Sequence, residues 1–157
     1  MHDFFEENVV TAIAEQKDFI YEGHFPDNDN WLTPERFKNA GYTINFRFLG
    51  LSDISLSAIR VFEPAQLGGH NVPPFEIERN FYGNLYQLNK RFQTIDLLRI
   101  IDSSHSAAPT VLAIFNKENV EFSVHHGKLP EWFEKFLPNL FEKIIEQETP
   151  ISPKERK

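Results

Sequence analysis

The chain has 157 residues, of which 41% are hydrophobic and 25% are charged, a composition typical of one globular domain. It contains no cysteine, which excludes disulfides, zinc–thiolate sites and cysteine nucleophiles. No stretch approaches the roughly 20 apolar residues of a membrane-spanning helix. The N-terminus has neither the basic region nor the continuous apolar region of a secretory signal. We therefore expect a cytoplasmic protein with one domain over residues 1–147 and a flexible tail over residues 148–157.

The negative charge is concentrated near the N-terminus. The net charge is −7, and residues 1–35 alone carry −8, because they hold nine acids and one base. Residues 36–130 carry +2, and residues 131–157 carry −1. A phosphate-binding surface needs the opposite sign, so we do not expect direct binding of nucleic acid. A basic protein is the electrostatic complement of such a surface, and an acidic face that serves only solubility is the alternative.

Two helices are expected in the first quarter of the chain. Apolar residues recur every four positions from Phe5 to Ile13, which predicts a helix over residues 4–16. A segment rich in glycine, proline, aspartate and asparagine follows and favours turns. Thr33 is a favourable N-cap and Gly41 a favourable exit, so these two residues predict a second, short helix between them.

The middle of the chain has the patterns of strands and of one helix. Residues 42–48 and 54–57 alternate apolar and polar side chains, which predicts a β-hairpin joined by residues 50–53. The spacing of apolar residues then predicts a helix that begins near Asn80. Residues 95–101 fit equally well as the end of this helix or as a buried strand.

The last third contains a second hairpin and a helix. Residues 110–115 and 120–124 predict two paired strands. Pro130 begins an amphipathic helix, in which Pro138 should cause a kink or a break. Helices at both ends and strands between them predict an α+β fold. We expect one antiparallel sheet, formed by the central and late hairpins and packed by N-terminal, central and C-terminal helices.

None of the recognised catalytic motifs occurs in the chain, and the histidines give only local candidates. His125 and His126 follow a predicted strand, where neighbouring side chains point to opposite faces, so they can share a metal only if the strand has ended. Residues 103–106 place hydroxyls beside an imidazole, residues 68–71 form a flexible loop, and His24 is followed by two acids. These patterns are typical of polar turns, and we expect no catalytic, cofactor or metal site.

The segment from Asp18 to Trp31 is the strongest functional candidate because it combines acids with aromatic side chains. Binding hot spots favour an aromatic anchor inside a polar rim, and charge on the rim speeds association with an oppositely charged partner. An ordinary loop whose aromatic side chains cover the core is the alternative. We predict that a partner contacts the following residues of this segment: Asp18, Tyr21, Glu22, Phe25, Asp27, Asp29 and Trp31.

In its small size, acidity, lack of cysteine and lack of a catalytic motif, the chain resembles the immunity proteins of bacterial contact-dependent growth inhibition systems. It is a resemblance of type over the whole chain and involves no diagnostic motif. It implies a non-catalytic protein that neutralises a cognate toxin, such as a nuclease, by tight binding and occlusion of its basic active site. The alternative is a small enzyme or ligand-binding domain whose site combines dispersed residues, including a histidine.

Overall fold

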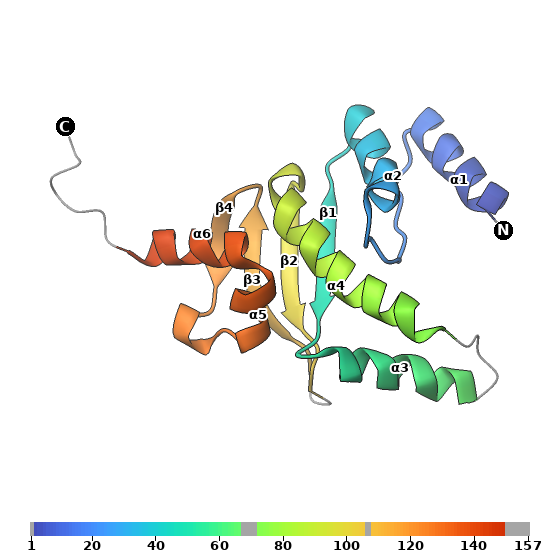
Figure 1. Cartoon of the computed structure of the whole chain (residues 1–157). Coiled ribbons are helices and arrows are strands. Elements are labelled where there is room, and N and C mark those ends of the chain that lie inside the picture. Colours follow the sequence, from blue (N-terminus) through green and yellow to red (C-terminus); the bar gives the residue numbers. More distant parts are fainter. Residues whose placement is uncertain (1, 67–71, 106–107, 150–157) are drawn as a thin grey trace, which may run out of the picture.

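Four strands form one sheet in the order β1-β2-β3-β4, with the helices grouped around it (Figure 1). The computed structural model describes residues 2–66, 72–105 and 108–149 of the chain. Within these residues the elements are, in chain order, α1 (His2–Ala14), α2 (Asn28–Asn39), β1 (Asn45–Gly50), α3 (Ile54–Gln66), α4 (Pro74–Arg91), the short 3-10 helix η1 (Phe92–Thr94), β2 (Leu97–Asp102), β3 (Thr110–Asn116), β4 (Asn119–Ser123), the 3-10 helix η2 (His126–Lys128), α5 (Glu131–Phe136) and α6 (Pro138–Glu148).

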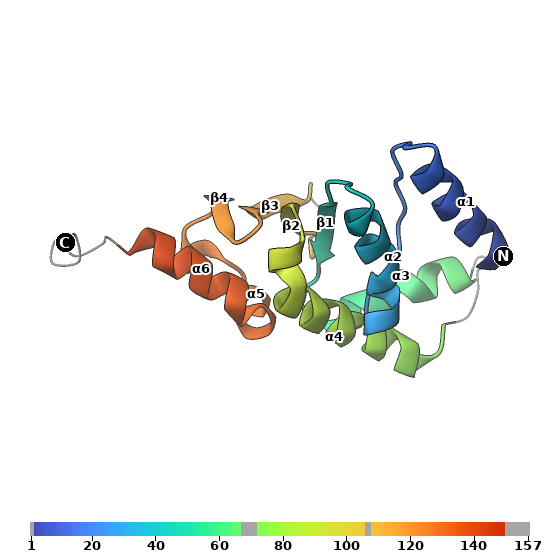
Figure 2. The ribbon, with the colours of Figure 1, turned by 90° about the horizontal axis from the view of Figure 1, so that it is seen from above.

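The main hydrophobic core lies between one face of the sheet and three helices. Figure 2 shows α4, α5 and α6 on the same side of the strands. Leu98 and Ile100 alternate along β2, and both are fully buried in the same apolar cluster as Leu140 and Ile144 of α6. The period of two along the strand and of four along the helix therefore direct both apolar faces into one core.

The α+β class is confirmed, but the sheet is mixed rather than wholly antiparallel as we expected. β1 pairs with β2 in parallel, and the antiparallel pairs are β2 with β3 and β3 with β4. The predicted central hairpin is wrong, because residues 54–57 form the first turn of α3. Asp53 explains the difference: its carboxylate accepts hydrogen bonds from the backbone N–H groups of Ser55 (2.8 Å) and Leu56 (3.2 Å), which caps a helix.

Two helices begin earlier than the sequence suggested. The N-cap of α2 is Asp27 rather than Thr33, and Pro34 lies inside the helix, although the exit at Gly41 is as expected, with φ +92°. α4 begins at Pro74 rather than near Asn80, since its first turn follows directly on Pro73. Asp27 supplies the side-chain cap of α2, and the fixed φ of Pro74 suits the first position of α4. The segment that we left open, residues 95–101, is largely the strand β2.

The other expected elements are present. α1 begins and ends two residues before the predicted helix. β3 and β4 form the late hairpin, and their pairing closes at Asn116 and Asn119. Pro138 does break the last helix, and α5 and α6 lie on either side of that break. α6 continues to Glu148, one residue into the predicted tail, and residues 150–157 lie outside the described part of the chain.

A second, smaller apolar cluster holds α1 in place. Val9 and Ala12 of α1 are buried against Phe37 of α2, with Phe19 packed at its margin. α1 and α2 consequently lie side by side at one end of the molecule, and α6 lies toward the other end (Figures 1 and 2). The N-terminal quarter is therefore attached to the sheet mainly through α2.

At Gly50, the last residue of β1, the packing leaves no room for a side chain. A Cβ atom at Gly50 would lie within 3 Å of three ring atoms of Trp132, whose side chain is buried. We expect Gly50→Ala to lower the free energy of unfolding by about 1–3 kcal/mol, as overpacking of a core does, measured by urea denaturation. Gly23→Ala is the matched control, because a Cβ atom at Gly23 has no neighbour within 4 Å. Equal stability of the two variants would contradict the packing described.

Candidate protein-binding surface

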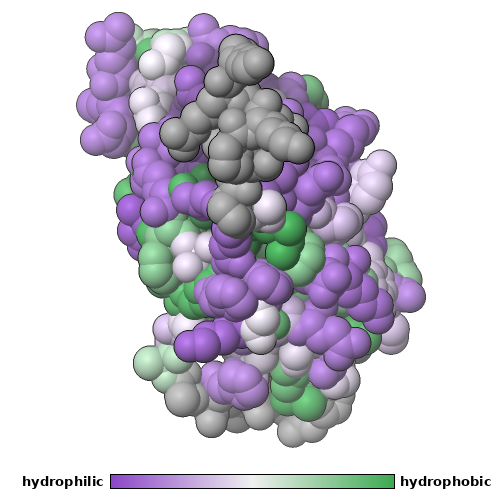
Figure 3. Space-filling model, turned by 90° about the vertical axis from the view of Figure 1, so that its left-hand side faces the viewer, coloured by the Kyte–Doolittle hydropathy of each residue, from purple (hydrophilic) through white to green (hydrophobic). Residues whose placement is uncertain are grey.

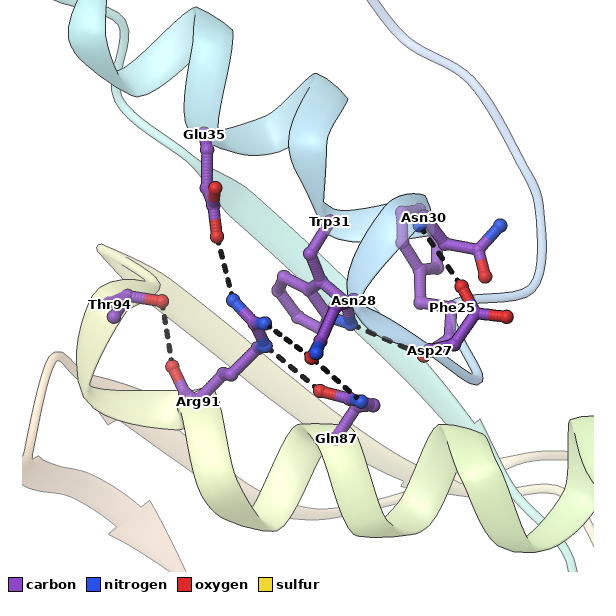
Figure 4. A network of polar contacts seen from close by, with 9 residues as sticks. All are labelled: Phe25, Asp27, Asn28, Asn30, Trp31, Glu35, Gln87, Arg91 and Thr94. Atoms are coloured by element: carbon purple, nitrogen blue, oxygen red, sulfur yellow. Dashed lines mark hydrogen bonds and ion pairs between the residues drawn. The ribbon is translucent and has the colours of Figure 1, made fainter.

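Trp31 was expected to be an exposed anchor, and the structure corrects this prediction. Its side chain is only 2% exposed and belongs to the main core. The indole stacks on Phe46 of β1, with ring centroids 5.4 Å apart and planes inclined by 11°. Its Nε1 donates a hydrogen bond to the backbone oxygen of Phe25 at 3.2 Å (Figure 4). Trp31 thus has no surface to offer a partner in the folded chain, and Phe25 is partly buried against the same core.

Arg91 completes this packing by tying α2 to α4 (Figure 4). Its guanidinium donates hydrogen bonds to Glu35 (2.7 Å), Asn28 (2.8 Å) and Gln87 (2.9 Å). The guanidinium carbon also lies 5.5 Å from the centre of the Trp31 ring, within the range of a cation–π interaction. Because the charge of Arg91 and three of its five N–H donors are used inside the molecule, this network serves to fix α2 on α4.

Asp27 has a structural role as well. Its carboxylate accepts a hydrogen bond from the backbone N–H of Asn30 at 3.3 Å, which caps α2, and it forms an ion pair with Arg79 of α4. The hydrogen bond from Arg79 is the main cause that holds the pKa of Asp27 below its usual value. Asp27 is therefore charged at neutral pH, but its charge is neutralised within the chain.

Tyr21 lies half-buried in a cluster of aromatic rings. The centres of the Phe5, Phe19 and Phe25 rings lie 5.3, 5.7 and 5.8 Å from the centre of the Tyr21 ring. Its hydroxyl is buried and has no hydrogen-bond partner among the described residues. Burial raises the pKa of Tyr21 to about 12. Tyr21 thus supports the aromatic cluster, and its polar atom does not face solvent.

Three of the predicted site residues remain available to a partner. Asp18, Glu22 and Asp29 are exposed and form no ion pair within the described residues, and the same holds for Glu7 of α1. Three further acids of this quarter are paired: Glu6 with Arg36, Glu15 with Lys17, and Glu35 with Arg91. The uncompensated charge of the folded chain is therefore carried by fewer acids than the sequence suggests.

Exposed apolar side chains occur on the same elements as these acids, and sequence reasoning missed them. Ile20 is 94% exposed in the extended segment between α1 and α2. Phe4 and Val10 lie outside the apolar stripe of α1, and Leu32 follows Asp29 by three residues on α2, which places both on one helix face. We call the following eight residues the N-terminal surface: Phe4, Glu7, Val10, Asp18, Ile20, Glu22, Asp29 and Leu32.

The hydroxyl–imidazole candidate does not form a nucleophile–base pair in the described residues. The Ser103 hydroxyl accepts a hydrogen bond from Arg60 (3.2 Å) and the Ser104 hydroxyl donates one to Asp102 (2.5 Å), whereas His105 is exposed. Both serine hydroxyls serve the local turn, and neither is oriented by the imidazole as acyl transfer requires. The glycine-rich candidate at residues 68–71 and Ser106 lie outside the described residues.

Two clefts offer some space for a ligand. One of about 280 Å³ lies where the start of α3 meets α4 and α5, and Tyr82, Trp132 and Phe136 contribute aromatic side chains to it. A second of about 90 Å³ contains His24, whose Nδ1 lies 3.1 Å from the Asn84 side-chain nitrogen. His24 is thus paired with an amide rather than with the acids that follow it.

The face of the sheet opposite the core carries no helix over it among the described residues (Figure 2). Arg47 and Arg99 lie directly opposite each other on the parallel strands β1 and β2. Leu49, Val111 and Phe122 are exposed nearby in the sheet. The charged side chains named on this outer face are basic, whereas those of the N-terminal surface are acidic. The two surfaces would therefore attract partners of opposite charge.

Replacing Tyr21 by Phe tests whether this residue is structural. At pH 8, we expect Tyr21→Phe to be at least as stable as the parent, because the deleted hydroxyl has no partner. Since burial raises the pKa of the folded state to about 12, against an ordinary value near 10, the stability associated with the neutral phenol is present below pH ~10 and is lost as the pH rises above it. Urea denaturation at pH 8 and pH 11 should show a smaller alkaline loss for the variant. A large loss at pH 8 would contradict this account.

Comparisons with protein-family models, with curated proteins and with solved structures found no match for this chain. Within the described residues, no helix combines the length and apolar character needed to cross a membrane. The fold and the surfaces described above are thus the whole basis for assigning a function.

Proposed function

We propose that the chain is a non-catalytic binding protein that docks on a basic protein partner through its N-terminal surface. The observation that carries the proposal is the imbalance of charge on that surface. Glu7, Asp18, Glu22 and Asp29 are exposed without an ion pair among the described residues, whereas Lys17, the one base among residues 1–35, pairs with Glu15. Such a surface attracts a positively charged partner and accelerates its encounter.

The apolar residues of the N-terminal surface are proposed to slow the dissociation of a complex, which exposed charge alone does not do. Exposed charge steers association, but it is screened over roughly 8–10 Å in ordinary buffers and contributes little to holding a complex together. Desolvation of large apolar side chains contributes more to a slow dissociation rate. Ile20 and Leu32, which stand next to acids on the same elements, are the side chains best placed for this role.

The kind of partner follows from the chemistry of the surface. A protein that binds nucleic acid presents a cleft lined by lysine and arginine. An acidic surface with apolar side chains can cover such a cleft and exclude the nucleic acid from it. We therefore propose that the chain acts as an immunity protein, which neutralises a toxin, such as a nuclease, by occluding its basic active site. This proposal agrees with the resemblance noted from the sequence.

Growth protection tests the proposed class of function. Proteins encoded beside the gene of this chain would each be produced in an inducible bacterial host, with and without the chain. We expect the chain to restore growth against one of them and to co-purify with its toxic domain. Absence of protection against every toxic neighbour would contradict the immunity proposal.

Charge reversal tests the surface itself. We expect the triple variant Asp18→Lys, Glu22→Lys and Asp29→Lys to reduce the association rate with that domain by about tenfold or more at low salt, with a much smaller effect at high salt. Stopped-flow fluorescence at two salt concentrations measures both rates. The control, Glu134→Lys with Glu142→Lys, reverses exposed charges on α5 and α6. Equal rates for both variants would place the interface elsewhere.

Ile20 provides a test of the apolar contribution. Because its side chain is 94% exposed, Ile20→Ser should leave the melting temperature unchanged. If Ile20 is buried on binding, the variant should dissociate from the partner faster, by roughly tenfold, with little change in the association rate. Leu49→Ser is the matched control, since Leu49 is also exposed but lies on the outer face of the sheet. An unchanged dissociation rate for Ile20→Ser would remove Ile20 from the interface.

A further inference from the structure

Two histidines and a glutamate come together where the chain leaves β4. The Nδ1 atom of His126 lies 2.5 Å from Oε2 of Glu148, and the Nε2 atom of His125 lies 3.7 Å from the same oxygen. One potential ligand atom from each of the three residues lies within 4.8 Å of the others. Glu148 is the last residue of α6, so the cluster joins two segments that are distant in the sequence.

The backbone explains why both imidazoles lie on the same side. Neighbouring residues in a strand point to opposite faces, but β4 ends at Ser123 and η2 begins at His126. His125 is the N-cap of η2, with φ −53° and ψ 139°, and the chain turns there. The centres of the His125 and His126 rings are consequently only 4.2 Å apart. The strand has therefore ended before the two histidines, and this is the condition under which they can share a metal ion.

We propose that His125, His126 and Glu148 bind a divalent transition-metal ion, and that zinc is the ion whose ligand preference they fit. Two imidazole nitrogens and one carboxylate oxygen form a known type of zinc ligand set, which leaves a fourth position for water. With zinc–ligand bonds of roughly 2.0–2.1 Å, tetrahedral ligand atoms lie about 3.3 Å apart. The separation of 3.7 Å between His125 and Glu148 is close to this value.

Binding requires small movements that the site permits. Nδ1 of His126 can bind the ion only when it carries no proton, with the remaining ring proton on Nε2, and the 2.5 Å separation between Nδ1 and Oε2 of Glu148 must then widen to admit the ion. The side chains of His125, His126 and Glu148 are 64%, 43% and 25% exposed, so the ion has an open path and the rings have room to move. Figure 3 shows the end of the molecule toward which α6 lies in Figure 1. Hydrophilic side chains predominate on this end.

One existing contact limits the affinity. The backbone N–H of Gly127 donates a hydrogen bond to Nδ1 of His125 at 3.2 Å. A metal ion on Nε2 leaves the proton on Nδ1, so this hydrogen bond must break. Tight zinc sites instead have an acceptor for that proton. We therefore expect moderate, micromolar affinity and a modest rise in stability, because the ion would link η2 to the end of α6.

Isothermal titration of the full chain, prepared without a histidine tag, with zinc chloride tests the site directly. We expect one zinc ion per chain, and at least about a tenfold loss of affinity in His126→Ala and in Glu148→Gln. His105→Ala is the control, because His105 is an exposed histidine outside the cluster. Zinc should also raise the melting temperature of the parent but not that of the double variant His125→Ala with His126→Ala.

Two results of the titration would overturn the proposal. One is equal zinc affinity of the parent and the double variant. The other is a loss in His105→Ala as large as that in His126→Ala, which would indicate non-specific binding by surface histidines. If a variant fails to fold, the parent alone still decides the matter by histidine NMR. In that experiment zinc should shift the ring signals of His125 and His126 and leave those of His24 and His105 unchanged, and the absence of this difference would refute the site.

Discussion

The placement of the N-terminal quarter depends on the packing of one side chain, the Trp31 indole. It lies on the Phe46 ring of β1, with the Arg91 guanidinium of α4 beside it, and it thereby joins α2 to the sheet and to the central helix. α1 packs in turn on α2 through the cluster around Phe37. The positions of the exposed acids on α1, on the following segment and on α2 therefore follow from this contact. A surface proposed to bind a partner is in this way held by the core rather than by its own interactions.

The role of Trp31 also shows what the sequence could and could not predict. An aromatic residue within a run of aspartates and asparagines looks like an exposed anchor, because nothing local indicates that Phe46 and Arg91 will cover it. Local patterns did predict elements whose stabilising contacts are also local, such as the hairpin of β3 with β4 and the break at Pro138. They predicted β1 as a strand but gave it the wrong partner, because β2 lies beyond two helices and the alternation of side chains within β1 does not indicate which strand will pair with it.

The same distinction holds for the two proposed sites. The sequence could single out the acids near the N-terminus only as a group. The folded chain separates Asp27, which caps α2 and pairs with Arg79, from Asp18 and Asp29, which form no ion pair among the described residues. The exposure of Ile20 could not be predicted, because an isolated apolar residue in an extended segment has no period to follow. For His125 and His126, the sequence could state only that they share a metal if the strand has ended. The third proposed ligand, Glu148, became apparent only from the position of α6 in the fold.

The parallel pairing of β1 with β2 has a consequence for the order in which the protein forms during synthesis. The hairpin of β3 with β4 closes after a short turn, whereas β1 must wait until α3, α4 and β2 have left the ribosome. Until then, Phe46 and Trp31 have no complete core to enter, and the nascent chain exposes several aromatic rings. The high density of acids in the first 35 residues opposes association between such nascent chains through like-charge repulsion. The acids that we propose for partner binding would therefore also oppose aggregation of the unfinished chain.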